Sequence, residues 1–185
     1  MFDLNSASWF GITTSPVPGK GERNRAAALG ALDDYRQAAF AGSLHRLSSI
    51  ISRGSNKLLS LAEVTARLNV KSRYSIGIRA VPLVRIRGSE ARSDDFDADF
   101  CPTQTHTKDR WVRIAIARRM GTALPAVQLI QVGDGYFVRD GHNRISVARA
   151  MGEEYLDAEV IVWQVAEQPC VLQPAFACEL ATNRT

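Results

Sequence analysis

The chain has 185 residues, of which 45% are hydrophobic and 23% are charged, and this composition excludes a wholly disordered protein. No apolar run approaches the roughly 20 residues that span a bilayer, and residues 1–10 lack the pattern of a secretory signal, so we expect no membrane partner. The formal charge of +4 is unevenly distributed, because residues 1–80 hold eleven basic and five acidic side chains, whereas residues 81–185 hold twelve basic and fourteen acidic ones.

The first part of the chain is predicted to be a basic helical N-terminal extension over residues 1–78. From residue 22 to residue 51, apolar side chains recur at spacings of three and four, which predicts an amphipathic helix. Gly42 lies in the middle of this pattern and is expected to weaken or divide the helix.

The second half of the extension has a weaker pattern. Ser60 and Glu63 form a capping box, which predicts a short helix over residues 61–68, and a basic, irregular stretch is expected over residues 71–80. The same region resembles the start of a helix-turn-helix, whose recognition helix would occupy residues 73–81. A glycine in the middle of that segment and a proline after it make it a poor helix former.

Residues 79–168 are predicted to form a compact mixed α/β domain, followed by a C-terminal tail over residues 169–185. The pattern of apolar residues, glycines and prolines predicts strands and helices in alternation. In chain order they are a strand over 81–86, an acidic loop over 87–99, a helix over 108–120, a strand over 127–132, a turn at 133–135, a strand over 136–138, a helix over 142–151 and a strand over 158–163.

Residues 140–144 are the segment with the clearest functional pattern, because a predicted strand ends in Asp-Gly and a predicted helix begins at once with His-Asn-Arg. The first N–H groups of a helix lack internal partners and carry partial positive charge. Gly141 allows an oxyanion to approach closely, Arg144 offers a guanidinium fork to phosphate oxygens, and His142 offers a donor or a base. These are the parts of a phosphate site. The alternative is that Asp140 only caps the helix and that the polar side chains face water.

Residues 141–144 resemble the nucleotide-binding box of the ParB/sulfiredoxin superfamily. Many members read Asp-Gly-His-His-Arg at this place, partition proteins read Gly-Glu-Arg-Arg, and sulfiredoxins read Gly-Cys-His-Arg. The resemblance covers about residues 80–165, since residues 81–86 resemble the family's opening strand and residues 123–138 its central hairpin. It implies a ParB/sulfiredoxin-like fold, which is a small mixed sheet with helices, and a bacterial branch with an Asp-Gly-His-x-Arg box.

The resemblance implies a nucleotide- or phosphate-binding protein, either an NTPase or a phosphotransferase, with ATP or CTP and Mg²⁺ as its ligands. Gly141, Asn143 and Arg144 would hold phosphate. His142 would polarise the substrate or donate a proton, with Asp140 as the residue that orients it. His142 stands where sulfiredoxins have their cysteine, so sulfinic-acid reduction has no nucleophile here. Asn143 replaces a second His or Arg, and its neutral amide should weaken nucleotide binding by about 1 kcal/mol or more.

Further residues outside the box are candidates for the same site. Lys108 and Arg110 begin the helix before the hairpin, where the resemblance places a nucleotide-facing surface, and His106 precedes them. The alternative is an ordinary solvated first turn. Four acidic residues in the preceding loop are candidates to hold Mg²⁺ with a triphosphate, or else form a solvated loop: Asp94, Asp95, Asp97 and Asp99.

The three cysteines are expected to be free thiols in a reducing cytoplasm. Cys101, Cys170 and Cys178 include no Cys-x-x-Cys pair, which argues against a disulfide framework and against a structural zinc site. No metal site is therefore predicted. Cys101 has no basic neighbour close in sequence, so a reactive thiol is not expected.

The alternative function is a DNA-associated protein, either partition-like, nuclease-like or a scaffold, whose nucleotide pocket is regulatory or vestigial. A homo-oligomer is compatible with either function. The basic arm would then contact nucleic acid without reading its sequence, or its arginines would simply face solvent on a helical flank of the α/β domain. The basic side chains in question are Arg23, Arg25, Arg36, Arg46, Arg53, Lys57, Arg67, Lys71 and Arg73.

Overall fold

The computed structural model describes residues 19–52, 56–66, 68–91 and 94–166. The beginning of the N-terminal extension and the whole of the predicted C-terminal tail lie outside the described residues, and so do Arg53, Arg67, Cys170 and Cys178. Within the described ranges, no helix has both the length and the apolar character needed to cross a membrane.

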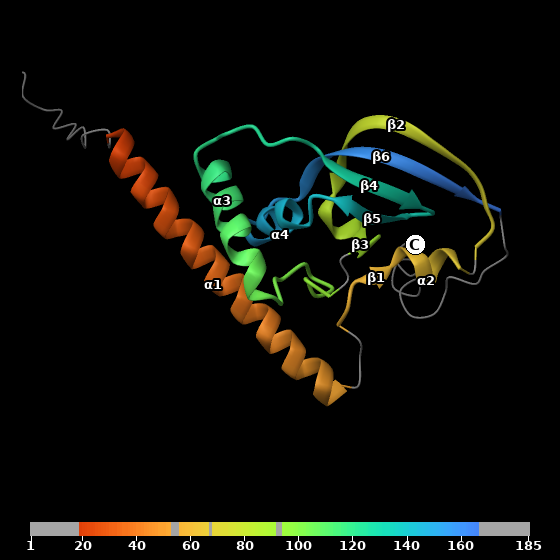
Figure 1. The fold of residues 1–185 in the computed structure, drawn as a ribbon, viewed down its shortest axis with the longest axis horizontal. Coiled ribbons are helices and arrows are strands. Elements are labelled where there is room, and N and C mark those ends of the chain that lie inside the picture. The colour runs from red at the N-terminus through yellow and green to blue at the C-terminus, as the bar shows by residue number, and fades with distance from the viewer. Residues whose placement is uncertain (1–18, 53–55, 67, 92–93, 167–185) are drawn as a thin grey trace, which may run out of the picture.

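In the part of the chain that the structure describes, six strands form one mixed sheet (Figure 1): β1 (Leu59–Ser60), β2 (Val70–Pro82), β3 (Ile86–Ser89), β4 (Val127–Val132), β5 (Gly135–Asp140) and β6 (Tyr155–Val165). Their order across the sheet is β1-β3-β5-β4-β6-β2. The pairs β1–β3, β3–β5 and β4–β6 are parallel, and the pairs β4–β5 and β2–β6 are antiparallel. The predicted α/β class with a small mixed sheet is therefore confirmed.

The described ranges also contain four α-helices: α1 (Lys20–Ser52), α2 (Leu61–Thr65), α3 (Lys108–Arg119) and α4 (His142–Ala150). Figure 1 shows α1 as one long helix that runs past α3, with α4 between α3 and the sheet and α2 beside β1. The predicted helical N-terminal part is therefore present. A 3₁₀ turn over Thr105–Thr107 leads into α3.

Helix α4 is enclosed on two sides, which explains why its sequence after the first turn is mostly apolar or small. Ile145 and Ala148 belong to the core that includes Val127 and Val138 of the sheet. Val147 packs instead with Trp111 of α3. The start of α4 is thereby held at one position relative to both the sheet and α3.

Helix α1 is attached to α3 through an aromatic contact and an ion pair. Trp111 is fully buried, and its ring lies edge-on to that of Tyr35, with the two centroids 5.5 Å apart. Its Nε1 atom donates a hydrogen bond to Ser146 Oγ at 2.8 Å. Arg119 Nη2 also lies 2.7 Å from Asp34 Oδ2. The long N-terminal helix is thus part of the folded unit.

One expectation for the extension is wrong, because residues 71–80 are not irregular: β2 runs through them and pairs with β6. The same strand occupies residues 73–81, so this segment, a poor helix former by its sequence, is not a recognition helix. Gly77, which argued against a helix, has φ 75° and lies at a register shift in this pairing, as expected of a β-bulge. The sheet therefore begins well before residue 79.

Gly42 does not divide α1, which continues through it. A Cβ atom at this position would lie 3.1 Å from the Cβ atom of Cys101. Glycine here therefore allows the loop that contains Cys101 to approach the helix closely. Its lower helix propensity is offset by this packing.

Two further local predictions need correction. The strand expected over residues 81–86 is interrupted, because β2 ends at Pro82 and a 3₁₀ turn over Leu83–Arg85 precedes β3. The capping box is also wrong, since Ser60 makes no side-chain cap hydrogen bond. The short helix ends at Thr65, whose hydroxyl donates to the Leu61 carbonyl at 2.8 Å, instead of extending to residue 68.

The elements of the second part follow the predicted order closely. Helices α3 and α4 begin at residues 108 and 142, as predicted. Each is followed by a glycine with positive φ, Gly121 at 70° and Gly152 at 72°, as expected at the position after a helix C-terminus. The turn between β4 and β5 likewise contains Gly133, with φ 61°.

Candidate anion site at the start of helix α4

Helix α4 starts from a tight turn that requires glycine. Gly141 has φ 103°, and a Cβ atom there would lie 2.5 Å from Val127 Cγ1, so the turn brings the helix start against the first residue of β4. The first bond within the helix runs from the Ile145 N–H to the Gly141 carbonyl. The N–H groups before Ile145 therefore lack acceptors inside the helix, at the end where the helix dipole is positive.

Arg144 makes several internal hydrogen bonds from the first turn of α4. Its Nη1 atom donates to the carbonyl oxygens of Pro125 at 2.5 Å and Ala126 at 2.9 Å. Its Nη2 atom donates to Asp140 Oδ2 at 2.6 Å. The Arg144 side chain is 12% exposed, whereas that of Asp140 is 57% exposed. Arg144 therefore ties the segment before β4 to the helix start, and its ion-pair partner is accessible to solvent.

An open groove of about 640 Å³ lies beside this helix start. Three guanidinium groups border it, those of Arg110 and Arg113 from α3 and that of Arg144 from α4. Neither Arg110 nor Arg113 has a carboxylate partner within the part of the chain that the structure describes. We call this feature the α3–α4 groove, and it is lined by Arg110, Arg113, Ile114, Ala117, Leu124, Pro125, Asp140 and Arg144.

The α3–α4 groove unites three of the residues singled out in the sequence, namely Arg110, Asp140 and Arg144. Lys108 does not line it. The Lys108 Nζ atom lies 6.0 Å from the centroid of the Tyr35 ring, so this side chain extends toward α1. The positive charge of the groove therefore comes from arginines alone.

His142 is buried and does not line the α3–α4 groove. Its Nε2 atom lies 2.7 Å from Ser89 Oγ, and its ring stacks on that of Phe96 with the centroids 6.0 Å apart. These contacts hold the first turn of α4 against β3 and the acidic loop. In this position His142 acts as an anchor of the helix start.

Asn143 is also buried, with 5% of its surface exposed. Its Oδ1 atom has no hydrogen-bond partner among the described residues. An unpaired acceptor in the interior is unfavourable. A water molecule or a ligand donor that reached this atom would therefore be stabilised next to the helix start.

The capping role considered for Asp140 does not occur. Gly141 occupies the N-cap position, and no side chain makes a cap hydrogen bond there. The Asp140 carboxylate accepts from Arg144 instead. This carboxylate is therefore placed in the groove, next to the guanidinium group that it neutralises.

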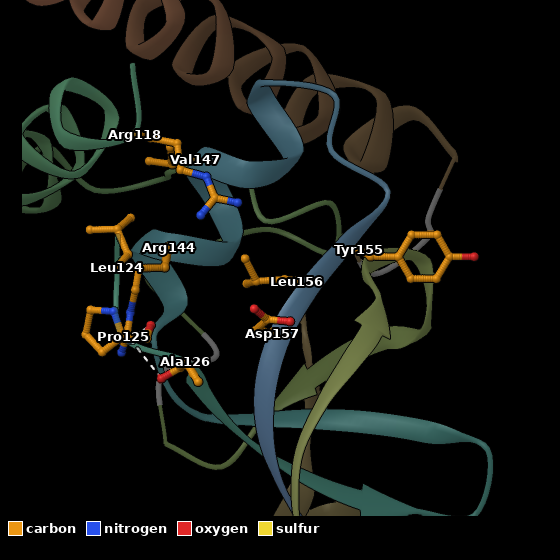
Figure 2. A pocket seen from close by; sticks show the side chains of 9 residues that line it. All are labelled: Arg118, Leu124, Pro125, Ala126, Arg144, Val147, Tyr155, Leu156 and Asp157. Carbon is orange, nitrogen blue, oxygen red and sulfur yellow. Dashed lines mark hydrogen bonds between the residues drawn. The ribbon is translucent and has the colours of Figure 1, made fainter. Parts of the chain in front are cut away.

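A second, smaller pocket of about 160 Å³ shares Leu124, Pro125 and Arg144 with the groove, and Figure 2 shows Arg144 beside Pro125. Its other arginine, Arg118, is already paired, because its Nε atom donates to Glu153 Oε1 at 2.6 Å and its Nη2 atom to the other oxygen. This hydrogen bond raises the pKa of Arg118. Because Glu153 compensates the positive charge of Arg118, the second pocket attracts an anion less strongly than the α3–α4 groove does.

The four aspartates of the acidic loop do not meet at one point. Asp94 and Asp95 face basic side chains from different segments, Lys57 and His106, each at 3.5 Å. Asp97 is buried, and its Oδ1 atom accepts two backbone N–H groups of its own loop at 2.7 and 3.0 Å. The loop is therefore organised by its own contacts, and Asp97 is not part of a solvated surface.

The thiol of Cys101 lies in this loop, away from the α3–α4 groove. Burial and the neighbouring carboxylates of Asp97 and Asp99 raise the pKa of Cys101 to about 12. The thiol is therefore protonated at neutral pH, and a protonated thiol is a poor nucleophile.

Two residues near the helix start were not predicted. Arg113 follows Arg110 by three positions on a predicted helix, which places both on one face, so the spacing itself was an available signal. Ser89 meets His142 across 53 residues. That contact depends on the pairing of β3 with β5, and no local pattern indicates it.

Comparisons with known proteins identify a fold similarity and no family. No family model matches the chain, and no curated protein matches it. Among solved structures, the chain is similar to sulfiredoxin from Arabidopsis thaliana, with 16% identity and a TM-score of 0.35, over 45% of this chain and 82% of that one. Shared fold does not imply shared function, and a similarity at this level carries no inference about activity.

Proposed function

We propose that the α3–α4 groove binds a phosphate-containing ligand. The observation that carries the proposal is the meeting of Arg110, Arg113 and Arg144 at the positive end of α4. Guanidinium groups form charge-assisted, bidentate hydrogen bonds with phosphate oxygens. The start of α4 adjoins the groove at Asp140 and Arg144, where the helix dipole adds partial positive charge.

Binding would require only a small rearrangement of the side chains. Asp140 is largely exposed, and an exposed ion pair contributes at most about 1 kcal/mol, so its carboxylate can move off Arg144 Nη2 when a phosphate approaches and stay beside the ligand. Arg144 would then offer Nη2 to the ligand while Nη1 keeps its bonds to the Pro125 and Ala126 carbonyls. Arg110 and Arg113 are exposed and can turn toward the ligand.

We further propose that the ligand is a nucleoside triphosphate, ATP or CTP with Mg²⁺, as the resemblance of the Asp-Gly-His-x-Arg box to the ParB/sulfiredoxin superfamily implies. A groove of this volume is in the range of small-molecule sites. Ile114, Ala117 and Leu124 give it an apolar wall for a base, beside the arginines for a polyphosphate.

Hydrolysis or phosphoryl transfer in the groove would require a group that orients or deprotonates the attacking oxygen. Asp140 is the carboxylate that lines the groove, whereas His142 is held by Ser89 and Phe96. We therefore assign the acid–base role in an NTPase or phosphotransferase to Asp140 and a positioning role to His142.

The test is isothermal titration calorimetry of the full chain with ATP, CTP, GTP and pyrophosphate, each with Mg²⁺. Because each guanidinium–phosphate hydrogen bond contributes about 1.5–3 kcal/mol, we expect Arg110→Ala and Arg113→Ala each to weaken binding by about tenfold or more. Arg85→Ala, which removes an exposed arginine outside the groove, should leave affinity unchanged. Absence of binding at millimolar ligand, or equal affinity in all variants, would contradict the proposal.

The DNA-associated alternative has weaker support in the described residues. On α1, Arg36 lies 3.3 Å from Asp33, and Arg46 donates to Ser43. The large apolar side chains of Phe40, Leu44 and others are exposed on the same helix. A surface on which an ion-paired arginine and exposed apolar side chains interrupt the basic residues is not the continuous basic stripe that binds nucleic acid well.

A further inference from the structure

A cluster of metal-ligating side chains lies where α1 meets the acidic loop, away from the α3–α4 groove. His45, Asp97 and Cys101 each offer one ligand atom, and these three atoms all lie within 4.8 Å of one another. His45 Nδ1 is 2.9 Å from Asp97 Oδ2, although 52 positions separate the two residues in the chain. The cluster is therefore assembled by the fold.

A fourth ligand atom faces the same imidazole. Asp99 Oδ2 lies 3.5 Å from His45 Nδ1, while the other Asp99 oxygen faces Arg149 Nη1 at 4.0 Å. Metal–ligand bonds of about 2.0–2.3 Å in tetrahedral zinc sites place adjacent ligand atoms roughly 3.3–3.8 Å apart. The distances from His45 Nδ1 to Asp97 Oδ2, 2.9 Å, and to Asp99 Oδ2, 3.5 Å, are close to that spacing.

The packing around the cluster favours a bound cation. A Cβ atom on Gly42 would lie 3.1 Å from Cys101 Cβ and 3.8 Å from Asp97 Oδ2, so glycine at this position is what allows α1 to approach the loop. Asp97 is 2% exposed, and the carboxylate of Asp99 approaches the same imidazole from the solvent side. A divalent ion would neutralise the negative charge that these groups place around one imidazole.

We propose that His45 Nδ1, Asp97 Oδ2 and Cys101 Sγ bind Zn²⁺, with Asp99 as the fourth ligand. A set of nitrogen, oxygen and sulfur donors suits Zn²⁺, whereas Mg²⁺ and Ca²⁺ are bound by oxygen donors. On binding, the ion takes the place of the thiol proton, which leaves to solvent. The ion joins α1 to the loop and stabilises their contact.

Co²⁺ is the spectroscopic probe for this site. The full chain carrying Cys170→Ser and Cys178→Ser, in which Cys101 is the remaining thiol, is freed of metal and titrated with Co²⁺. We expect one equivalent to produce a thiolate-to-cobalt charge-transfer band and the visible absorption of a tetrahedral ion, and Zn²⁺ to displace it. Zn²⁺ should also raise the melting temperature.

Substitutions identify the ligands. Cys101→Ser should abolish the charge-transfer band, and His45→Ala and Asp99→Asn should each weaken Zn²⁺ binding by about tenfold or more. His106→Ala, which removes another histidine that faces a carboxylate, is the matched control and should have no effect. Absence of the band, or Zn²⁺ affinity that is unchanged in both Cys101→Ser and His45→Ala, would overturn the proposal and leave the cluster as a hydrogen-bonded contact.

Discussion

Arg144 lines the groove and also stabilises the fold, because its guanidinium group donates hydrogen bonds to two backbone carbonyls. We predict that Arg144→Ala lowers the free energy of unfolding by about 2 kcal/mol, since the Pro125 and Ala126 carbonyls lose their charged donor. Asp140→Asn keeps both of those bonds and should cost at most about 1 kcal/mol. Urea denaturation of the two variants measures the difference. Equal losses would show that the ion pair, and not the carbonyl contacts, accounts for the stabilisation.

Gly141 provides the second prediction at the residue scale. Gly141→Ala combines a positive φ with a Cβ atom 2.5 Å from Val127 Cγ1, so we expect it to destabilise the fold by about 3 kcal/mol or more. Gly121→Ala is the matched control, because Gly121 also has a positive φ but has nothing within 4 Å of its added Cβ. It should cost only about 1 kcal/mol. Identical denaturation midpoints for the two variants would refute the steric part of this argument.

At the scale of elements, the sequence predicts most closely those segments whose start, apolar pattern and end are all marked by nearby residues. Helix α4, for example, begins where Asp-Gly precedes an apolar pattern and ends before a glycine, and each of those signals acts within a few residues. Strand β2 was missed because most of its side chains are exposed, so neither an alternating nor a helical pattern develops. Its extended conformation comes from pairing with β6, and the paired residues of the two strands are more than 70 positions apart in the chain.

The attachment of α1 to α3 is testable at this scale. Tyr35 is buried against Trp111, and we predict that Tyr35→Ala lowers the free energy of unfolding by about 3 kcal/mol. Phe40→Ala is a matched control on the same helix, because the Phe40 side chain is 65% exposed and its loss should change stability by less than about 0.5 kcal/mol. Circular dichroism during urea unfolding reports both. A larger effect from Phe40→Ala would mean that α1 is held by its other face.

At the scale of the whole molecule, the positive charge that matters for the proposed function is local. The basic excess of the chain belongs to residues 1–80, yet the groove lies in the part with more acidic than basic side chains. The sequence located the start of α4 correctly but not the directions of its side chains. Successive helix residues differ by about 100°, so His142 and Arg144 meet different surroundings, and only the packing of β3 and α3 decides which of them is buried.

The central claim is that a phosphate ligand binds in the α3–α4 groove, and the most direct measurement is a series of ¹H–¹⁵N NMR spectra of the full chain titrated with Mg²⁺-ATP and, separately, with pyrophosphate. We predict that the backbone amides of residues 142–144 and the Nε–H groups of Arg110 and Arg113 shift along one saturating curve, while the amides of β2 stay in place. Unchanged groove signals at millimolar ligand, or shifts confined to α1 and β2, would contradict the claim.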